Sequence, residues 1–283
     1  MTALNYLESL NPLQYESVCS TEGPNLIIAG AGTGKTKVLT TRVAHIIDNN
    51  LAFPSQILCV TFTNKAAREM SERVQKLVSQ NMEKMPWMGT FHSIGAKIIR
   101  NHAEVIGLKQ SFTILDKDDQ LSLIKQIIKA ENLDQSQFSP KLIQSKIDHW
   151  KNKALNPNEI KSETLDNLVD EKSLSIYQIY QARLFEINCL DFGDLLLQCI
   201  NLFKVPDIHK RYSNNFKYIH VDEYQDTNAA QYKWLKLLGS HHKNVCCVGD
   251  DDQSIYSWRG AEVDNMLRFE KEFENAKIIR LKQ

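Results

Sequence analysis

The chain has 283 residues, of which 42% are apolar and 24% are charged, a composition typical of globular domains. Its 34 basic and 34 acidic residues give a formal net charge of zero, which excludes a global basic field that would attract nucleic acid. The six cysteines include no CxxC pair, which indicates reduced thiols of a cytoplasmic protein, and no apolar stretch approaches the length of a membrane span. We expect one or two globular domains, with any nucleic-acid contact confined to local patches.

Short apolar runs alternate with helical patterns in the first third of the chain. Strands are predicted at 25–30 (NLIIAG) and 56–62 (QILCVTF). Each is followed by a predicted helix, at about 35–48 and 64–78. The run WMGTF, at 87–91, indicates a third strand. This alternation predicts parallel strands joined by crossover helices.

The middle of the chain has a different pattern, because helical signals dominate from about 111 to 186. Within 116–133, apolar residues recur at helical spacing, namely Leu121, Ile124 and Ile128. We expect that helix to begin near Asp118 or Asp119. Strand patterns then resume, at 217–223, 244–250 and 276–281. The sequence therefore predicts an α/β fold, in which helices flank a parallel sheet and an all-helical subdomain is inserted.

The stretch AGAGTGKT, residues 29–36, lies between a predicted strand and a predicted helix, as a phosphate-binding loop must. Its glycines let backbone N–H groups close around phosphates, and the helix N-terminus adds partial positive charge. Lys35 is expected to reach the β- and γ-phosphates of ATP, and Thr36 to ligate Mg²⁺. A glycine-rich turn that binds nothing is the alternative, but the strand–loop–helix setting and the GKT ending favour phosphate.

Two acids directly follow the predicted strand YIHV, at Asp222 and Glu223. Asp222 would hold Mg²⁺, and Glu223 would orient and deprotonate the attacking water. Acids end many strands, so the pair acquires meaning only together with the phosphate loop. Asp226 is ambiguous, since it could simply cap the next helix.

Seven segments together carry a resemblance to a known family, and they span nearly the whole chain: LNPLQ (10–14), AGAGTGKT (29–36), TFTNKAAREM (61–70), GTFHS (89–93), LDFGDLL (190–196), VDEYQDTN (221–228) and GDDDQSIYSWRGA (249–261). In this order they resemble the N-terminal half of UvrD/Rep/PcrA-type DNA helicases of superfamily 1. In that family alanine is usual where this chain has Ala29. The resemblance implies a P-loop, RecA-like ATP-binding domain formed by 1–106 and 190–283, and a helical subdomain at 107–189. A second RecA-like domain is expected to lie outside these residues.

The resemblance also implies a nucleotide site. Gln14 would read the adenine edge, where a fixed amide can both donate and accept. Gln253 would contact the γ-phosphate and sense hydrolysis. The residues assigned to the nucleotide are Gln14, Ala29, Gly30, Ala31, Gly32, Thr33, Gly34, Lys35, Thr36 and Lys37. Lys37 stands where the family more often has arginine, which would weaken or alter any contact from that position.

A single-stranded DNA track is implied in the same way, by Phe62, Thr63, Asn64, His92, Phe192, Tyr256, Trp258 and Arg259. Aromatic faces stack on any base without reading its sequence. On composition alone, Phe62 and Phe192 would be core residues and His92 a satisfied polar residue. Tyr256 and Trp258 stand among polar residues, which favours a surface role. Arg259 could contact either DNA or the ATP site.

Two features of the middle segment leave alternatives open. Gly193 stands where the family commonly has an acid, although Asp191 and Asp194 are present. The lysines of the helical insertion could contact duplex phosphates or could form a solvated face, and they are Lys141, Lys146, Lys151 and Lys153.

The activity that the resemblance implies is 3′–5′ stepping along single-stranded DNA driven by ATP hydrolysis. Single-stranded DNA, its junction with duplex and other DNA-repair proteins would be the partners. In the family, two further arginines come from beyond this stretch, so we expect weak nucleotide binding and slow hydrolysis from a truncated or split-gene product. The alternatives are the helicase portion of a RecB/AddA-type helicase–nuclease and a non-catalytic ATP- or DNA-binding module. The downstream acids, glutamine and aromatics argue against other P-loop enzymes such as kinases.

Overall fold

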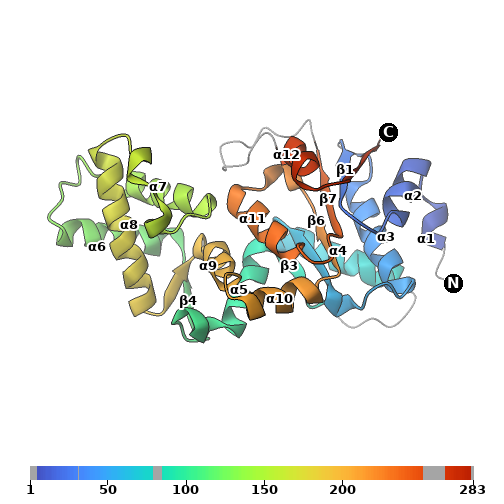
Figure 1. Ribbon diagram of the computed structural model, residues 1–283, viewed down its shortest axis with the longest axis horizontal. Helices are drawn as coiled ribbons and strands as arrows, with labels where there is room; N and C mark the ends of the chain where they lie inside the picture. Colours follow the sequence, from blue (N-terminus) through green and yellow to red (C-terminus); the bar gives the residue numbers. More distant parts are fainter. Residues whose placement is uncertain (1–4, 31, 79–84, 251–264, 282–283) are drawn as a thin grey trace. The chain divides into compact units, whose positions relative to one another are not determined.

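The protein is described here by a computed structural model that covers residues 5–30, 32–78, 85–250 and 265–281. Its strands are β1 (Asn25–Ala29), β2 (Ile57–Thr61), β3 (Met88–Thr90), β4 (Thr113–Leu115), β5 (Cys189–Asp191), β6 (Tyr218–Val221), β7 (Val245–Gly249) and β8 (Lys277–Leu281). A six-stranded parallel sheet has the order β3-β2-β6-β7-β1-β8, and β4 pairs with β5 in a second, two-stranded sheet. This confirms the predicted α/β fold with a parallel sheet flanked by helices (Figure 1).

Helices connect the strands of both sheets. The α-helices are α1 (Asn5–Glu8), α2 (Pro12–Cys19), α3 (Lys35–Asp48), α4 (Asn64–Leu77), α5 (Phe91–Asn101), α6 (Lys117–Ala130), α7 (Pro140–Asn152), α8 (Leu168–Glu186), α9 (Asp194–Leu202), α10 (Pro206–Asn215), α11 (Ala229–Leu238) and α12 (Asn265–Glu272). Short 3₁₀ turns are η1 (Pro54–Gln56), η2 (Ala103–Ile106), η3 (Pro157–Glu159), η4 (Ser162–Thr164) and η5 (Tyr224–Asp226). Within the described ranges, no helix is both long enough and apolar enough to cross a bilayer.

The chain divides into two compact units. Unit 1 comprises Met1–Ile94, Pro206–Asn228 and Leu235–Gln283, and it contains the six-stranded sheet. Unit 2 comprises Gly95–Val205 and Ala229–Trp234, and it contains the two-stranded sheet. The predicted domain limits, after residues 106 and 189, stay a prediction.

The strands in the middle of the six-stranded sheet are buried along their whole length. β1, β2, β6 and β7 consist of buried residues only, whereas the edge strands β3 and β8 include partly exposed ones. Continuous apolar runs such as NLIIA and ILCVT are typical of parallel strands that are covered on both faces. The predicted strands are confirmed, and pairing within the sheet satisfies the backbone hydrogen bonds of these buried apolar runs.

One buried arginine fixes the helices around the first strand. Arg42, on α3, is 1% exposed and donates to the carbonyl oxygens of Ser17 at 2.6 Å and Thr21 at 3.1 Å. Both carbonyls belong to α2 or the turn after it, so these bonds hold α2 against α3. Neighbouring α3 residues, including Val38 and Val43, pack into the core under the sheet. The start of α3, where a phosphate site is predicted, is therefore held by buried contacts.

Unit 2 has a helical core, as predicted for the inserted segment. α6, α7 and α8 bury a common set of apolar residues that includes Ile124, Ile147 and Tyr177. Helix α6 begins at Lys117, with Asp118 and Asp119 in its first turn as expected, and Asp116 is its N-cap and accepts the N–H groups of residues 118 and 119 at 2.9 Å. The term all-helical was wrong in one respect, since β4 and β5 form a parallel ladder here. Strands of three residues are too short to show a periodicity.

Candidate functional site

The predicted nucleotide residues gather at the carboxyl edge of the six-stranded sheet. The phosphate loop follows β1, the acidic pair follows β6, and Asp250 follows β7. These three strands are neighbours in the order β6-β7-β1. In parallel α/β sheets, ligands bind in the crevice outside the carboxyl ends of the strands. Residues that are about 190 to 220 positions apart in the sequence are thereby brought to one edge.

The phosphate loop has the backbone conformation that its glycines allow. Gly32 has φ 78° and Gly34 has φ 90°, values in the left-handed region that other residues rarely adopt. Thr33 closes the loop, because its hydroxyl donates to the Gly30 carbonyl at 2.8 Å. Gly34 is the N-cap of α3, so Lys35 and Thr36 lie in the first helical turn, where free N–H groups can receive an anion. Ala29 ends β1 as a buried residue, and Ala31 lies outside the described residues.

Gln14 braces this loop from α2. Its Nε2 donates to the Thr33 carbonyl at 2.9 Å, and its Oε1 accepts the N–H of Asn11 at 3.2 Å. In turn, Asn11 Oδ1 accepts the backbone N–H of Gln14 at 2.9 Å, and the two bonds form a capping box at the start of α2. Both amide atoms of Gln14 are thus engaged within the protein. Adenine reading by Gln14 stays a prediction, and it would require the amide to exchange one of these bonds.

Lys35 is held by two carboxylates from neighbouring strand ends. Its Nζ lies 3.1 Å from Asp250 Oδ2 and 3.7 Å from Glu223 Oε2. The Asp250 side chain is 1% exposed and that of Lys35 is 13% exposed, so the closer pair is shielded from solvent. Because a phosphate is the expected partner of Lys35, these carboxylates occupy the position of an anion. ATP would have to compete with them for the ammonium group.

Gln225 closes a ring of contacts around Lys35. Its Nε2 donates to Glu223 Oε2 at 2.7 Å, and its Oε1 accepts the backbone N–H of Asp250 at 3.1 Å. Gln225 is 4% exposed and lies in η5. The ring therefore joins the phosphate loop, the acidic pair and the end of β7 through four residues. Sequence reasoning missed Gln225 and gave Asp250 no firm role. The only signal was their position just beyond two strand ends.

The acidic pair is shaped by burial and by an unusual backbone. Asp222 is 7% exposed and its Oδ1 accepts the Glu223 N–H at 3.1 Å. Glu223 has φ 51° and ψ 44°, a left-handed conformation that is uncommon for glutamate and concentrates at functional sites. Burial, aided by the Glu223 carboxylate, raises the pKa of Asp222 from 3.8 to about 6. A divalent cation fits this pair, because positive charge would relieve the cost of ionising a buried acid.

Two further predicted nucleotide residues lie around the loop. Thr36 follows Lys35 in the first turn of α3 and is half-buried. Lys37 is exposed, and its Nζ donates to the Ser9 carbonyl at 2.6 Å. Lys37 therefore tethers α3 to the segment before α2, and a contact to the nucleotide from this position stays a prediction.

Four predicted DNA residues lie at the adjoining part of the same sheet edge. Phe62, Thr63 and Asn64 follow β2, and His92 follows β3, which is paired with β2 through Thr61 and Thr90. Thr63 is exposed and is the N-cap of α4, so its hydroxyl accepts the Ala66 N–H at 3.1 Å. Asn64 is exposed as well. The structure thus places these residues together, beside the strand that carries the acidic pair.

Of the two rings in this group, Phe62 is less buried than the core residue that composition alone suggested. Phe62 is half-buried and packs edge-on against the buried Phe91, with ring centroids 5.5 Å apart. One edge of Phe62 is thereby anchored while part of the ring stays accessible. His92 is half-buried, and burial lowers its pKa below the usual 6.5. A neutral imidazole offers a flat face without requiring a phosphate partner.

Phe192 and the lysines of the insertion belong to unit 2. Phe192 is 49% exposed, so the interpretation of this ring as a core residue was wrong. Lys151 is 1% exposed and pairs with Asp191 and Asp194, which excludes both a phosphate contact and a solvated face for this lysine. Lys146 forms an ion pair with Asp170. The remaining predicted residues, Gln253, Tyr256, Trp258 and Arg259, lie outside the described residues.

Residues 10–274 match the family described as UvrD/REP helicase N-terminal domain. The chain belongs to this family. It is 51% identical over 283 residues to a DNA helicase II of Rickettsia typhi and 49% identical over 278 residues to an ATP-dependent DNA helicase PcrA of Staphylococcus aureus. These alignments cover 99% and 98% of this chain but only 43% and 38% of the two relatives. The chain thus spans about two fifths of the curated relatives that it matches.

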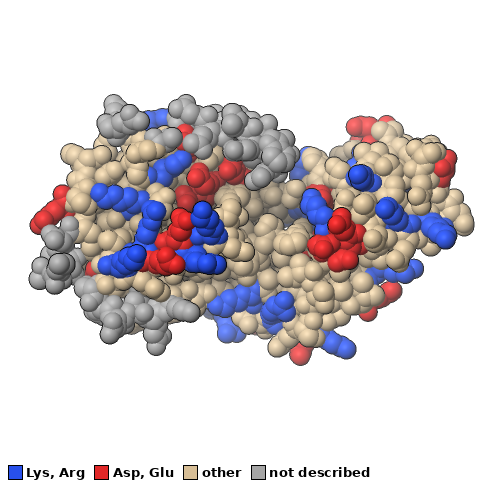
Figure 2. Space-filling view, turned by 180° about the vertical axis from the view of Figure 1, so that it is seen from behind, with Lys and Arg blue, Asp and Glu red and all other residues tan. Residues whose placement is uncertain are grey.

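One face of the described part of the chain carries side chains of both charges. On the face seen in Figure 2, the basic and acidic side chains that are drawn in colour lie interspersed. Along α4, for example, Lys65 lies 4.0 Å from Glu69. This accords with the zero net charge of the sequence.

Proposed function

We propose that these 283 residues form the ATP-binding part of a 3′–5′ DNA helicase that steps along single-stranded DNA. The observation that carries the proposal is the shared sheet edge. The phosphate loop follows β1 and the acidic pair follows β6, and Lys35 links the two. Two of the candidate base-stacking residues, Phe62 and His92, follow β2 and β3, which come next to β6 in the sheet. The nucleotide-binding residues and these candidate DNA-binding residues therefore lie close together along one edge of the sheet. A rearrangement at the nucleotide would have only a short way to travel to reach the DNA.

The roles of individual residues follow from this arrangement. Lys35 would exchange its carboxylate partners for the β- and γ-phosphates of ATP. Thr36 and Asp222 would hold Mg²⁺, which when bound neutralises charge on the phosphates. Glu223, whose carboxylate is oriented by Gln225, would accept a proton from the attacking water. Gln253 would sense the γ-phosphate.

The DNA side of the proposal rests on flat rings and a few polar groups. Phe62, His92 and Phe192, with Tyr256 and Trp258, would stack on bases at about 1–3 kcal/mol each and without sequence preference. Single-stranded DNA next to a duplex junction is the proposed substrate. We place the activity in DNA repair or replication and in the cytoplasm. The free state of all six cysteines supports a reducing compartment.

The experiment that tests this function measures the coupling of two ligands. Affinity for a labelled oligothymidylate is measured with and without a non-hydrolysable ATP analogue and Mg²⁺. We expect DNA binding that changes with the analogue, and Lys35→Ala should abolish the change while leaving DNA binding in place. Absence of DNA binding, or analogue dependence that survives in Lys35→Ala, would overturn the proposal. Polarity is tested by unwinding of 3′-tailed against 5′-tailed duplexes by a longer protein that contains this chain.

A further inference from the structure

Unit 2 buries a lysine and two aspartates together where β5 meets α9. Lys151 Nζ lies 2.8 Å from Asp191 Oδ2 and 2.9 Å from Asp194 Oδ1, and its side chain is 0% exposed. The ammonium also lies over the rings of Tyr177 and Tyr180, 5.6 and 5.2 Å from their centroids. Two acids and one base leave this buried cluster with an excess negative charge. Such a group costs desolvation energy that an apolar cluster of similar size would not.

The same two carboxylates close the turn between them. Asp191 Oδ1 accepts the N–H of Asp194 at 2.9 Å, and Asp194 Oδ2 accepts the N–H of Asp191 at 3.3 Å. The Tyr180 hydroxyl donates to Asp191 Oδ2 at 2.9 Å. Each carboxylate therefore has one oxygen on the turn and one on the Lys151 ammonium. The backbone of residues 191–194 is held at both ends by the buried lysine.

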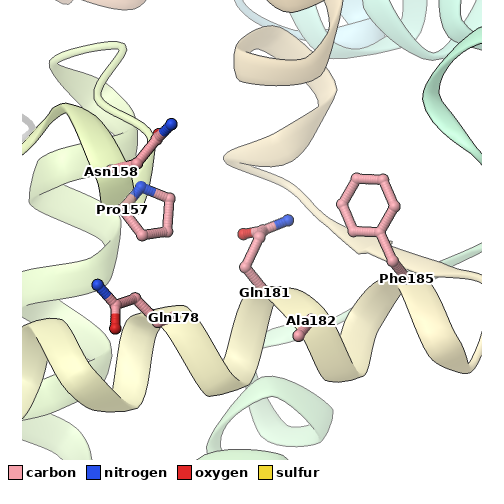
Figure 3. Close-up of a pocket in the computed structure, with 6 residues that line it drawn as sticks. All are labelled: Pro157, Asn158, Gln178, Gln181, Ala182 and Phe185. Carbon is pink, nitrogen blue, oxygen red and sulfur yellow. The ribbon is translucent and has the colours of Figure 1, made fainter.

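Asp194 is supported from α8 and from its own helix. Gln181 and Gln198 donate to Asp194 Oδ1 at 3.1 and 3.4 Å. Gln181 also lines an open surface pocket of about 410 Å³ with Pro157 and Phe185, and Figure 3 shows these side chains. Burial and the Asp191 carboxylate raise the pKa of Asp194 to about 6. Burial alone would raise the pKa of Asp191 too, but Lys151 holds it below its usual range.

Gly193 makes room for this lysine. A Cβ at this position would lie 2.8 Å from Lys151 Cδ and 3.0 Å from Lys151 Cβ. Gly193 has φ −63°, a value that any residue can adopt. A glycine is favoured at this position because a Cβ would collide with the Lys151 side chain, and not because of the backbone conformation. A side chain at 193 would have to displace the buried stem of Lys151. The turn and the lysine are therefore fitted to each other.

The turn presents one large apolar side chain to solvent. Phe192 is 49% exposed, whereas Asp191 and Asp194, on either side of it, are 2% and 0% exposed. A ring on a backbone that is already fixed loses little conformational entropy when it binds a partner. Supporting contacts of this kind distinguish a preorganised binding group from an incidental exposed one.

We propose that Lys151 is a positioning residue for single-stranded DNA, which acts by holding the turn that carries Phe192. The inference rests on the proposed function, since it takes a base as the partner of Phe192. Lys151 itself does not touch the DNA. It sets the place and rigidity of the ring, through the carboxylates of Asp191 and Asp194.

The test compares the affinities of variants for a labelled oligothymidylate at several salt concentrations. Lys151→Met removes the ammonium but keeps the length of the side chain. We expect it to weaken binding by about 5- to 160-fold, the loss that one stacked base represents. Phe192→Leu should lose as much, and the double variant should bind no more weakly than Phe192→Leu. The slope of log affinity against log salt should stay unchanged, whereas loss of a phosphate contact would reduce it by about 1.

Two controls separate positioning from loss of structure. Ile147→Val lowers packing in the same helix at a site that is 0% exposed, and it should leave DNA affinity unchanged. Tyr180→Phe deletes one hydrogen bond to Asp191 and should weaken DNA binding less than Lys151→Met does. It tests the positioning role if Lys151→Met does not fold.

The outcomes separate the DNA role of Phe192 from the positioning role of Lys151. If Phe192→Leu binds like the parent protein, the proposed DNA role of this ring is wrong and the inference falls with it. If Phe192→Leu weakens binding but Lys151→Met and Tyr180→Phe do not, the positioning role alone is wrong. A reduced salt slope in Lys151→Met, or losses that add in the double variant, also overturn it.

Discussion

Replacement of Asp222 by asparagine should stabilise the ligand-free protein at alkaline pH. Asp222 is 7% exposed, and its pKa is raised from 3.8 to about 6, first by burial and then by Glu223. Its ionised form is therefore costly until a cation binds. Asparagine keeps the oxygen that accepts the Glu223 N–H at 3.1 Å and removes the charge. Function is expected to suffer, as is common where an active site holds a destabilising group.

The size of the effect follows from the pKa shift of Asp222. Its folded pKa lies above the unfolded value, so the folded state binds the proton more tightly. The resulting stability is fully present below pH 3.8 and is lost as the pH rises through about 6. A shift of about 2 units at about 1.4 kcal/mol per unit gives a cost of up to about 3 kcal/mol at pH 8. At pH 4.5 the cost is about 1 kcal/mol.

The assay is urea unfolding in the presence of a metal chelator at pH 4.5 and pH 8. Asp222→Asn should be more stable than the parent protein by up to about 3 kcal/mol at pH 8 and by about 1 kcal/mol at pH 4.5. Glu131→Gln removes the charge of an exposed acid at the end of α6 and is the matched control, with no such pH-dependent gain expected. An equal gain at both pH values, or a loss at pH 8, would refute the reasoning.

Three further outcomes are expected around the phosphate loop. Gln225→Leu removes the amide oxygen that accepts the N–H of Asp250 at 3.1 Å, which should cost about 1–3 kcal/mol in unfolding free energy. It should also lower kcat for ATP hydrolysis more than it raises KM, and an effect on KM alone would contradict this. Gly34→Ala combines φ 90° with a Cβ only 2.9 Å from Gln14 Nε2, whereas Gly23→Ala has φ 76° and open space. In urea unfolding, Gly34→Ala should lose at least about 1 kcal/mol more than Gly23→Ala, and equal losses would show that the contact is unimportant. Gln14→Ala should weaken binding of a fluorescent ATP analogue, which unchanged affinity would disprove.

Much of the nucleotide site could be predicted because its signals are local. A glycine-rich stretch between a strand and a helix, and acids after a strand, specify chemistry within a few residues. The loop conformation at Gly32 and Gly34, and the position of Lys35 on the first turn of α3, agree with those signals. The ring that links Lys35 to Asp250 and Gln225 could not be read in this way. Its members come from three strand ends, and only the sheet order makes them neighbours.

In unit 2, sequence patterns also failed to predict which side chains are buried. Its lysines look alike in the sequence, yet Lys141 is exposed and Lys151 is buried between two aspartates. Phe192 follows an apolar run, as a core residue would, but it is half exposed. The burial of a side chain depends on which residues of other elements pack against it. The periodicity of a single segment does not contain that information.

The sequence by itself determined the strands, the phosphate loop, the acidic pair and the family, because each depends on residue types at short spacing. Only the tertiary structure decided which charges face one another. The pairing of Lys35 with Asp250, and of Lys151 with Asp191 and Asp194, joins residues that are 215, 40 and 43 positions apart. The physical reason is that the free energy of a charge depends on its burial and its partners, and both are set by the packing of distant segments.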